Sequence, residues 1–184
     1  PMRPGVQTAD VFGALFATYA TLASLVGAAR NGEGRIADVS LVEASIAAAA
    51  WEAAEYLETG KVPQPMGNRH RLTAPYQLFE TSDGRYVAIG MPNDMLFQKF
   101  MHVVGLEQHL SDPRFGTYAN RKKNEDPLLA LVEPAIRRMK SDVLEKALMD
   151  AGVPCSCVNN FEQVFSHPQI VARDVVKTIE HPRL

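Results

Sequence analysis

The segment from Val11 to Ala29 contains no charged residue and is rich in alanine, threonine, serine and glycine. Such a run predicts a helix, which we expect to have Thr8 as its N-cap and to end near Arg30. Its length would also suit a membrane span. Its many small residues and the lack of flanking aromatic and basic belts argue against a span. We therefore expect a helix that neighbouring protein buries on all sides, and no membrane contact.

The rest of the first 60 residues is also predicted to be mainly helical. Gly32 and Gly34 should end the first helix, because glycine readily adopts the positive φ angles found at helix ends. Residues 36–40 then suggest a short strand or an extended link. Residues 41–58 are dominated by alanine, leucine and glutamate, which favour a second long helix. Residues 1–60 are therefore expected to form a helical segment.

A different composition begins at residue 61. Three prolines, one glycine and no hydrophobic periodicity between Lys61 and Pro75 predict a loop that links two domains. A structureless connection of this length is unusual in a compact domain, and such loops often carry function. We therefore expect residues 61–75 to be a linker that contributes to a functional site.

Residues 76–184 are predicted to form a small α+β domain. Two alternating segments flank Ser82-Asp83-Gly84, a pattern typical of an antiparallel hairpin. A helix should follow, with Asn93 or Asp94 as N-cap, and residues 111–126 are polar and expected to be irregular. The remaining pattern predicts helices over 127–140 and 141–152, a short strand over 153–160, and one short helix after it. The fold class is thus α+β, with long N-terminal helices before a small domain with an antiparallel sheet.

Composition narrows the possible partners and compartments. The formal net charge is −2 and there is no long basic run, so binding to nucleic acid or to an anionic membrane is not indicated. The two cysteines, Cys155 and Cys157, are separated by one residue, which makes neither a zinc site nor a good disulfide. We therefore expect a reducing, cytoplasmic compartment.

Few residues are arranged for catalysis. The five histidines do not have a metal-ligand spacing, so no metal is expected. The glycine-containing turns do not match a phosphate-binding loop, and no nucleophilic serine motif is present. Asp10 remains, as a lone acid in the first turn of the first helix. Helix starts favour acidic residues, so Asp10 is either a simple helix-start acid or a catalytic carboxylate, and composition does not choose between them.

Several motifs, in order along the chain, resemble family III CoA-transferases, the group that includes formyl-CoA transferase, carnitine CoA-transferases and α-methylacyl-CoA racemase. Residues 4–47 resemble the middle of that family. The matching positions there are Asp10 with Gly13, Gly32 with Gly34, Ala37–Leu41, and Glu43 with Ala44. Residues 66–100, 112–121 and 151–176 are similar to later family motifs, so the resemblance covers nearly the whole chain.

The resemblance implies a mechanism and a site. Asp10 would attack an acyl-CoA thioester, form a mixed anhydride and then an aspartyl-CoA thioester, so coenzyme A enters as a substrate. Each step passes through an oxyanion that needs preset N–H donors. Gly67 is the candidate donor because a residue without Cβ allows close approach of the backbone. Asn68, Arg69 and His70 would line the acyl or acceptor-carboxylate side of the site.

The resemblance also implies the overall context and leaves alternatives open. Family members are about twice as long and form interlocked homodimers, so residues 1–60 would belong to a large CoA-binding domain of a longer chain. We expect the isolated 184-residue chain to bind CoA weakly and to show little transferase activity. Acyl-CoA racemases of the same superfamily carry a glutamate where this chain has Asn93, which favours a transferase. The third reading is an inactive truncated module that self-associates through its apolar helices.

Overall fold

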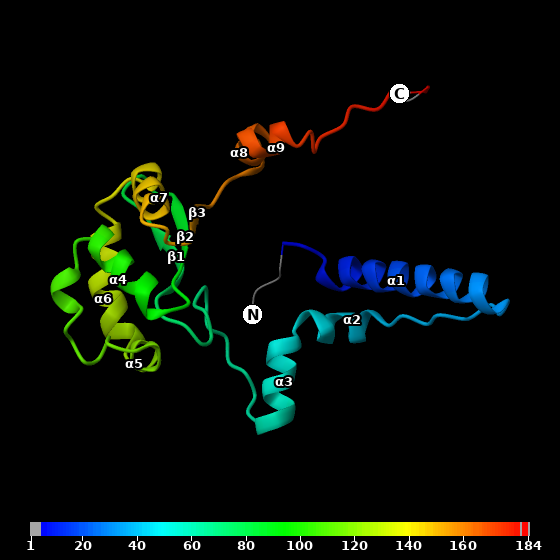
Figure 1. The fold of residues 1–184 in the computed structure, drawn as a ribbon, viewed down its shortest axis with the longest axis horizontal. Coiled ribbons are helices and arrows are strands. Elements are labelled where there is room, and N and C mark those ends of the chain that lie inside the picture. The colour runs from blue at the N-terminus through cyan, green and yellow to red at the C-terminus, as the bar shows by residue number, and fades with distance from the viewer. Residues whose placement is uncertain (1–4, 181, 184) are drawn as a thin grey trace. The chain divides into compact units, whose positions relative to one another are not determined.

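The computed structural model describes residues 5–180 and 182–183, and its contacts divide the chain into two units between Pro65 and Met66 (Figure 1). In the described part of the first unit, all regular secondary structure is helical. Its helices are α1 (Thr8–Asn31), α2 (Leu41–Ala48) and α3 (Ala50–Thr59). The link between α1 and α2 has no regular secondary structure, so the extended alternative for residues 36–40 is confirmed.

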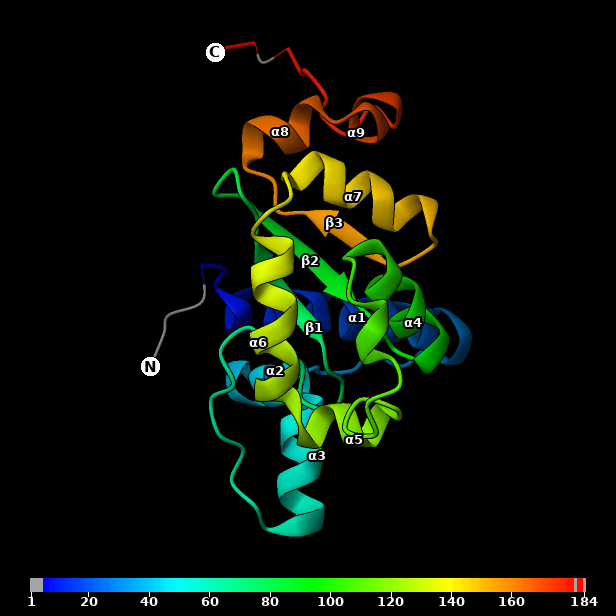
Figure 2. The same ribbon diagram turned by 90° about the vertical axis from the view of Figure 1, so that its left-hand side faces the viewer.

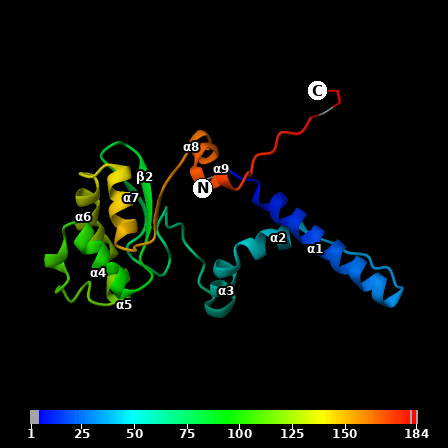
Figure 3. The same ribbon diagram turned by 45° about the horizontal axis from the view of Figure 1, so that its top comes forward.

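Helices α1 and α2 lie side by side, and Gly13 of α1 makes the close approach possible (Figure 3). A Cβ atom added to Gly13 would lie 2.5 Å from Cδ2 of Leu41. Gly13 is nevertheless the only buried residue of α1. The prediction that protein buries this helix on all sides is therefore wrong for the described residues, where α2 is the helix of this unit that packs against α1 and most of the α1 surface stays exposed.

Among the described residues, α1 alone is long and apolar enough to cross a membrane, a test of length and composition only. The absence of membrane contact stays a prediction. The ends of the predicted helices also need correction. The residue before α1 is Gln7, so Thr8 is the first helical residue and its side chain does not cap the helix. The second predicted helix breaks at Ala49, whose N–H is shared between the carbonyls of Ser45 and Ile46.

The second unit contains a three-stranded antiparallel sheet with the strand order β1-β2-β3. Strands β1 (Tyr76–Glu80) and β2 (Tyr86–Gly90) form the predicted hairpin, and β3 (Cys155–Cys157) pairs with the other side of β2. The predicted hairpin and the predicted short strand are both confirmed. Because β2 is central, β1 keeps one free edge.

Among the residues of this unit that the structure describes, seven helical segments accompany the sheet. They are α4 (Asp94–Val103), the 3-10 helix η1 (Glu107–His109), α5 (Tyr118–Lys123), α6 (Glu125–Ile136), α7 (Ser141–Asp150), α8 (Phe161–Ser166) and α9 (Pro168–Ala172). The expected N-cap of α4 is Asn93, whose Oδ1 accepts a hydrogen bond from the Leu96 N–H at 2.9 Å.

Two predictions for this unit are wrong. The segment expected to be irregular contains α5, because the Thr117 side chain accepts a hydrogen bond from the Asn120 N–H and starts a helix. The single short helix expected after β3 is two helices. Pro168 cannot continue α8, since it lacks an N–H, and instead it opens α9 with His167 as N-cap.

Helices α6 and α7 lie over one face of the sheet, and α4 packs against α7 (Figure 2). The core between these layers is apolar and tightly enclosed. Its most deeply buried side chains include Val87 and Ile89 of β2, Phe100 and Met101 of α4, Leu128 and Ile136 of α6, and Leu144 and Leu148 of α7. This arrangement of helices on a small antiparallel sheet confirms the α+β fold class.

Candidate functional site

Asp10 lies in the first turn of α1, as the sequence predicts, and its side chain is exposed. Helix N-termini present free backbone N–H groups and the positive end of the helix dipole, which favour a carboxylate. Within the described residues, no hydrogen bond or ion pair engages the Asp10 carboxylate. It is thus available to an incoming group.

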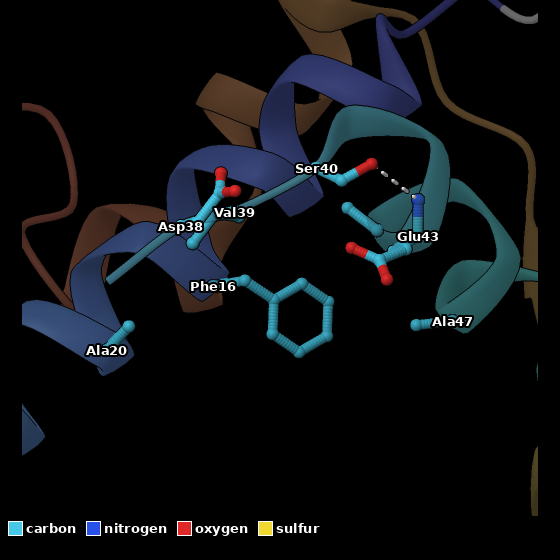
Figure 4. Close-up of a pocket in the computed structure, with 8 residues that line it drawn as sticks. Phe16, Ala20, Asp38, Val39, Ser40, Glu43 and Ala47 are labelled. Carbon is cyan, nitrogen blue, oxygen red and sulfur yellow. Dashed lines mark hydrogen bonds between the residues drawn. The ribbon is translucent and has the colours of Figure 1, made fainter. Parts of the chain in front are cut away.

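A cavity of about 340 Å³ lies in the same unit, between α1, α2 and the link that joins them (Figure 4). Phe16 and Ala20 of α1 line one side, and Glu43 and Ala47 of α2 line the other. The rest of the lining is Asp38, Val39, Ser40 and Ala44. The surface is mainly apolar with two carboxylates, and Asp10 does not line it. Sequence reasoning did not single out this cavity, because its residues come from two separate segments.

The other predicted site residues lie together on the loop before β1, in the second unit. Gly67 has a φ of 66°, and the Arg69 N–H donates to the Met66 carbonyl at 3.3 Å, so the loop makes a tight turn there. A Cβ atom on Gly67 would meet no atom within 4 Å, so the need for glycine comes from backbone conformation rather than from space. Within the described residues, the N–H groups of Gly67 and Asn68 have no acceptor.

Beyond this turn, the loop runs along the free edge of β1. The His70 N–H donates to the Tyr76 carbonyl at 2.9 Å, and Nδ2 of Asn68 contacts the Leu78 carbonyl at 3.5 Å. The His70 ring stacks on the Tyr76 ring, with centroids 4.7 Å apart and an interplanar angle of 9°. Nδ1 of His70 accepts hydrogen bonds from the N–H groups of Leu72 and Thr73, at 3.2 Å each. The His70 imidazole thus helps to hold the conformation of the loop.

Charged residues at the junction of α5 and α6 contact the same loop. Nη1 of Arg69 lies 2.7 Å from Oδ1 of Asp126 and 3.7 Å from Oε2 of Glu125. Nζ of Lys122 donates to the His70 carbonyl at 2.8 Å and to Oε2 of Glu125 at 2.7 Å. Sequence reasoning missed Lys122, Glu125 and Asp126, because only the tertiary fold brings them to a loop more than fifty residues earlier.

The sequence-predicted residues therefore fall into two groups. Asp10 belongs to the first unit, whereas Gly67, Asn68, Arg69 and His70 belong to the second. The second group offers two adjacent backbone donors and a set of side chains already engaged in holding the loop. No group of three or more His, Cys, Asp or Glu side chains suited to a metal ion occurs among residues 5–180 and 182–183. Asn93, the position of the racemase glutamate, caps α4 instead.

An acyl-CoA transferase from Fusarium pseudograminearum is 33% identical over 176 residues, which are 96% of this chain and 38% of that protein. The succinyl-CoA:glutarate CoA-transferase of Homo sapiens is 30% identical over 185 residues, 99% of this chain and 41% of that protein. A CAIB/BAIF family protein from Brucella suis matches with a TM-score of 0.79 and 37% identity, over 95% of this chain and 46% of that one.

The chain thus spans less than half the length of these proteins. The model of the CoA-transferase family III matches residues 1–184, the entire sequence. The order of motifs, the α+β fold and this match agree, and the chain belongs to CoA-transferase family III.

Proposed function

We propose that the complete protein carrying this chain transfers CoA from an acyl-CoA to a carboxylic acid, with Asp10 as the nucleophile. The observation that carries the proposal is the exposed carboxylate of Asp10 at the start of α1, which has no partner among the described residues, in a chain of this family. A carboxylate is a weak nucleophile in water, so the complete site must position it against the thioester and exclude solvent.

The proposed reaction begins with attack of an Asp10 oxygen on the thioester carbonyl carbon. The carbon–sulfur bond breaks and CoA thiolate departs. The acyl group remains on Asp10 as a mixed anhydride. The thiolate then attacks the Asp10 carbonyl carbon, which releases the donor acid and forms an aspartyl-CoA thioester. The acceptor carboxylate attacks this thioester, forms a second anhydride and expels the thiolate. Attack of the thiolate on the acceptor's acyl carbon yields the new acyl-CoA and restores the Asp10 carboxylate.

Each attack creates a tetrahedral oxyanion, which preset N–H donors can stabilise. The adjacent N–H groups of Gly67 and Asn68 support a role as such donors, because no described group accepts from them. Arg69 and His70 would lie on the acyl or acceptor-acid side of the site, where they hold the loop in shape. A short dicarboxylic acid such as glutarate is the proposed acceptor class, by analogy with the succinyl-CoA:glutarate transferase that is 30% identical to this chain.

The proposal extends to assembly and compartment. A homodimer would cover apolar side chains that α1 exposes, such as Leu15, Leu22 and Leu25. The unpaired Cys155 and Cys157 are consistent with a reducing cytoplasm. Light scattering of the complete protein tests the assembly, and a monomeric mass would contradict it.

Thioester exchange between succinyl-CoA and labelled glutarate tests the reaction in the complete protein. The Asp10→Asn variant should lose at least about a thousand-fold in rate, because an amide cannot form the anhydride. Asp142 is a matched control, since it is also an exposed first-turn acid, in α7, and its Asn variant should keep its rate. Hydroxylamine should trap the acyl-enzyme on the peptide that contains Asp10. A label on another residue, or full activity of Asp10→Asn, would refute the assignment.

A further inference from the structure

The loop that carries Gly67–His70 contains no helix or strand, yet its polar groups are held at several points. On one side, β1 accepts hydrogen bonds from the His70 N–H and Asn68 Nδ2. Long irregular loops are usually the least stable parts of a fold. The rigidity of the Gly67–His70 loop therefore also depends on the contacts that it makes on the side away from β1. Such contacts come to Arg69 and His70 from one short stretch at the junction of α5 and α6.

Lys122 connects the two sides of this contact. Its Nζ atom donates a 2.8 Å hydrogen bond to the His70 carbonyl and lies 2.7 Å from Oε2 of Glu125. The Lys122 side chain is 23% exposed. Glu125 is more deeply placed, at 11% side-chain exposure, and its other oxygen, Oε1, is buried without a hydrogen-bond partner among the described residues. A carboxylate in this position depends on the nearby cations, because burial penalises an unpaired charge.

Arg69 makes the second connection from the loop to the same junction. Its guanidinium lies 2.7 Å from Asp126 and 3.7 Å from Glu125. The Asp126 side chain is 81% exposed, so this ion pair alone contributes little to stability. Together, however, Arg69 and Lys122 place two cations around one nearly buried carboxylate, and both cations restrict the loop that bears Gly67.

We propose that Lys122 and Glu125 are positioning residues for the reaction: they hold the Gly67–Asn68 turn so that its free N–H groups face the developing oxyanion. This inference rests on the proposed function. The two residues need not touch substrate. They act through the His70 carbonyl and the Arg69 guanidinium, and thereby set the conformation of the turn two to three residues earlier. Catalysis is sensitive to such placement, since a misplacement of about 1 Å can reduce a rate about a hundred-fold.

The first test measures the loop itself, by hydrogen exchange in the 184-residue chain. Lys122→Met should increase the exchange rates of the backbone amides in residues 66–75 at least about ten-fold, because the His70 carbonyl loses the hydrogen bond from Lys122. Lys123→Met is the matched control, since Lys123 is the next residue of α5 and is exposed with no ion pair among the described residues. Exchange in residues 66–75 that is equal in the two variants would overturn the proposal.

A double variant separates loop positioning from folding. Lys122→Met alone leaves the nearly buried Glu125 carboxylate with the more distant Arg69, 3.7 Å away, as its neighbouring cation, and can weaken the whole unit. Lys122→Met combined with Glu125→Met removes both charges, so the global stability should return toward the wild-type value. The loop should still exchange rapidly, because the hydrogen bond from Lys122 to the His70 carbonyl is still missing. Recovery of both stability and loop protection would mean that the pair serves folding only.

The second test uses the complete protein and thioester exchange from succinyl-CoA. The double variant should lower kcat about ten- to a hundred-fold and leave the KM for succinyl-CoA within about two-fold, since the turn acts in the transition state. Lys122→Arg should recover part of kcat, and Lys123→Met should retain all of it. An unchanged kcat in the double variant would contradict the positioning role of Lys122 and Glu125. It would not affect the proposal that Asp10 is the nucleophile. An inactive wild-type protein would instead refute the proposed function. The hydrogen-exchange experiment would still test whether Lys122 holds the loop.

Discussion

Asp83, in the turn between β1 and β2, accepts a 2.8 Å hydrogen bond from Oγ of Ser141, the first residue of α7. The Ser141 N–H lies 3.3 Å from both carboxylate oxygens, and Oγ1 of Thr81 donates to Oδ1 at 2.6 Å. These hydrogen bonds, that from Thr81 above all, hold the pKa of Asp83 far below its ordinary value of 3.8. One carboxylate thus joins the hairpin turn to a helix that begins 58 residues later.

Replacing Asp83 with asparagine should lower stability and change its pH dependence. The folded-state pKa is depressed, so the ionised form stabilises the fold at any pH above the unfolded value of 3.8, and this contribution is lost as the pH falls below it. Urea unfolding should therefore show a lower midpoint for Asp83→Asn at pH 7 and a smaller decrease in stability between pH 5 and pH 2. Asp150→Asn, which removes an exposed ion pair with Lys146, should behave like the wild type.

The core beneath the sheet should depend strongly on Phe100, which has no exposed surface. Phe100→Ala should reduce the free energy of unfolding by about 3–5 kcal/mol, since it removes buried apolar area and leaves a cavity. Phe161→Ala is the control, because Phe161 is 79% exposed, and it should change stability by less than about 1 kcal/mol. Chemical denaturation of both variants provides the measurement, and equal losses would contradict the assigned core.

The turn at Gly67 should tolerate a side chain poorly. Its φ of 66° costs a residue with a Cβ atom about 1 kcal/mol, although no neighbour blocks the space. Gly67→Ala should therefore lower stability slightly, and in the complete protein it should reduce thioester exchange by more than that loss accounts for. Gly84→Ala, at a similar φ of 72° in the hairpin turn, should show the strain without the loss of activity. Equal activity of the two variants would argue against Gly67 as a donor.

The thiols of Cys155 and Cys157 should react slowly with iodoacetamide at pH 8. Burial, followed by a hydrogen bond with Glu145, raises the pKa of Cys157 to about 11 from 9.0, and burial also raises the pKa of Cys155. The thiolate fraction of Cys157 is then about a hundred-fold lower than that of an ordinary thiol. Mass spectrometry should find alkylation slow in the folded chain and fast in urea.

A raised thiol pKa also has a consequence for stability. The folded state retains the Cys157 proton where the unfolded state loses it, so stability should fall as the pH rises from 9 toward 11. Glu145→Gln should speed alkylation of Cys157, because it removes a negative charge beside the sulfur. Glu162→Gln is the control, since Glu162 is an exposed residue of α8, and it should not change the alkylation rate of Cys157. Rapid alkylation of the folded wild-type chain would contradict this assignment.

Local sequence signals predicted the elements whose ends are decided locally. The alternation on either side of Ser82-Asp83-Gly84 predicts the hairpin, and the pair Asn93-Asp94 predicts the start of α4, where the Asn93 side chain caps the helix. The same kind of reasoning missed α5 and the division between α8 and α9. The Thr117 cap lies inside a polar stretch without hydrophobic periodicity, and Pro168 both ends one short helix and opens the next.

The sequence by itself determined the α+β class and the family, because those depend on periodicity, turn chemistry and the order of motifs along the chain. The same motifs are the source of the proposal that Asp10 and Gly67 belong to the site. Only the tertiary structure decided which side chains hold the Gly67 loop, and that Arg121 lies buried between Asp94 and the Phe97 ring. Such partners are brought together by burial of a shared core. Because they lie more than twenty residues apart in the sequence, no local periodicity predicts their contact.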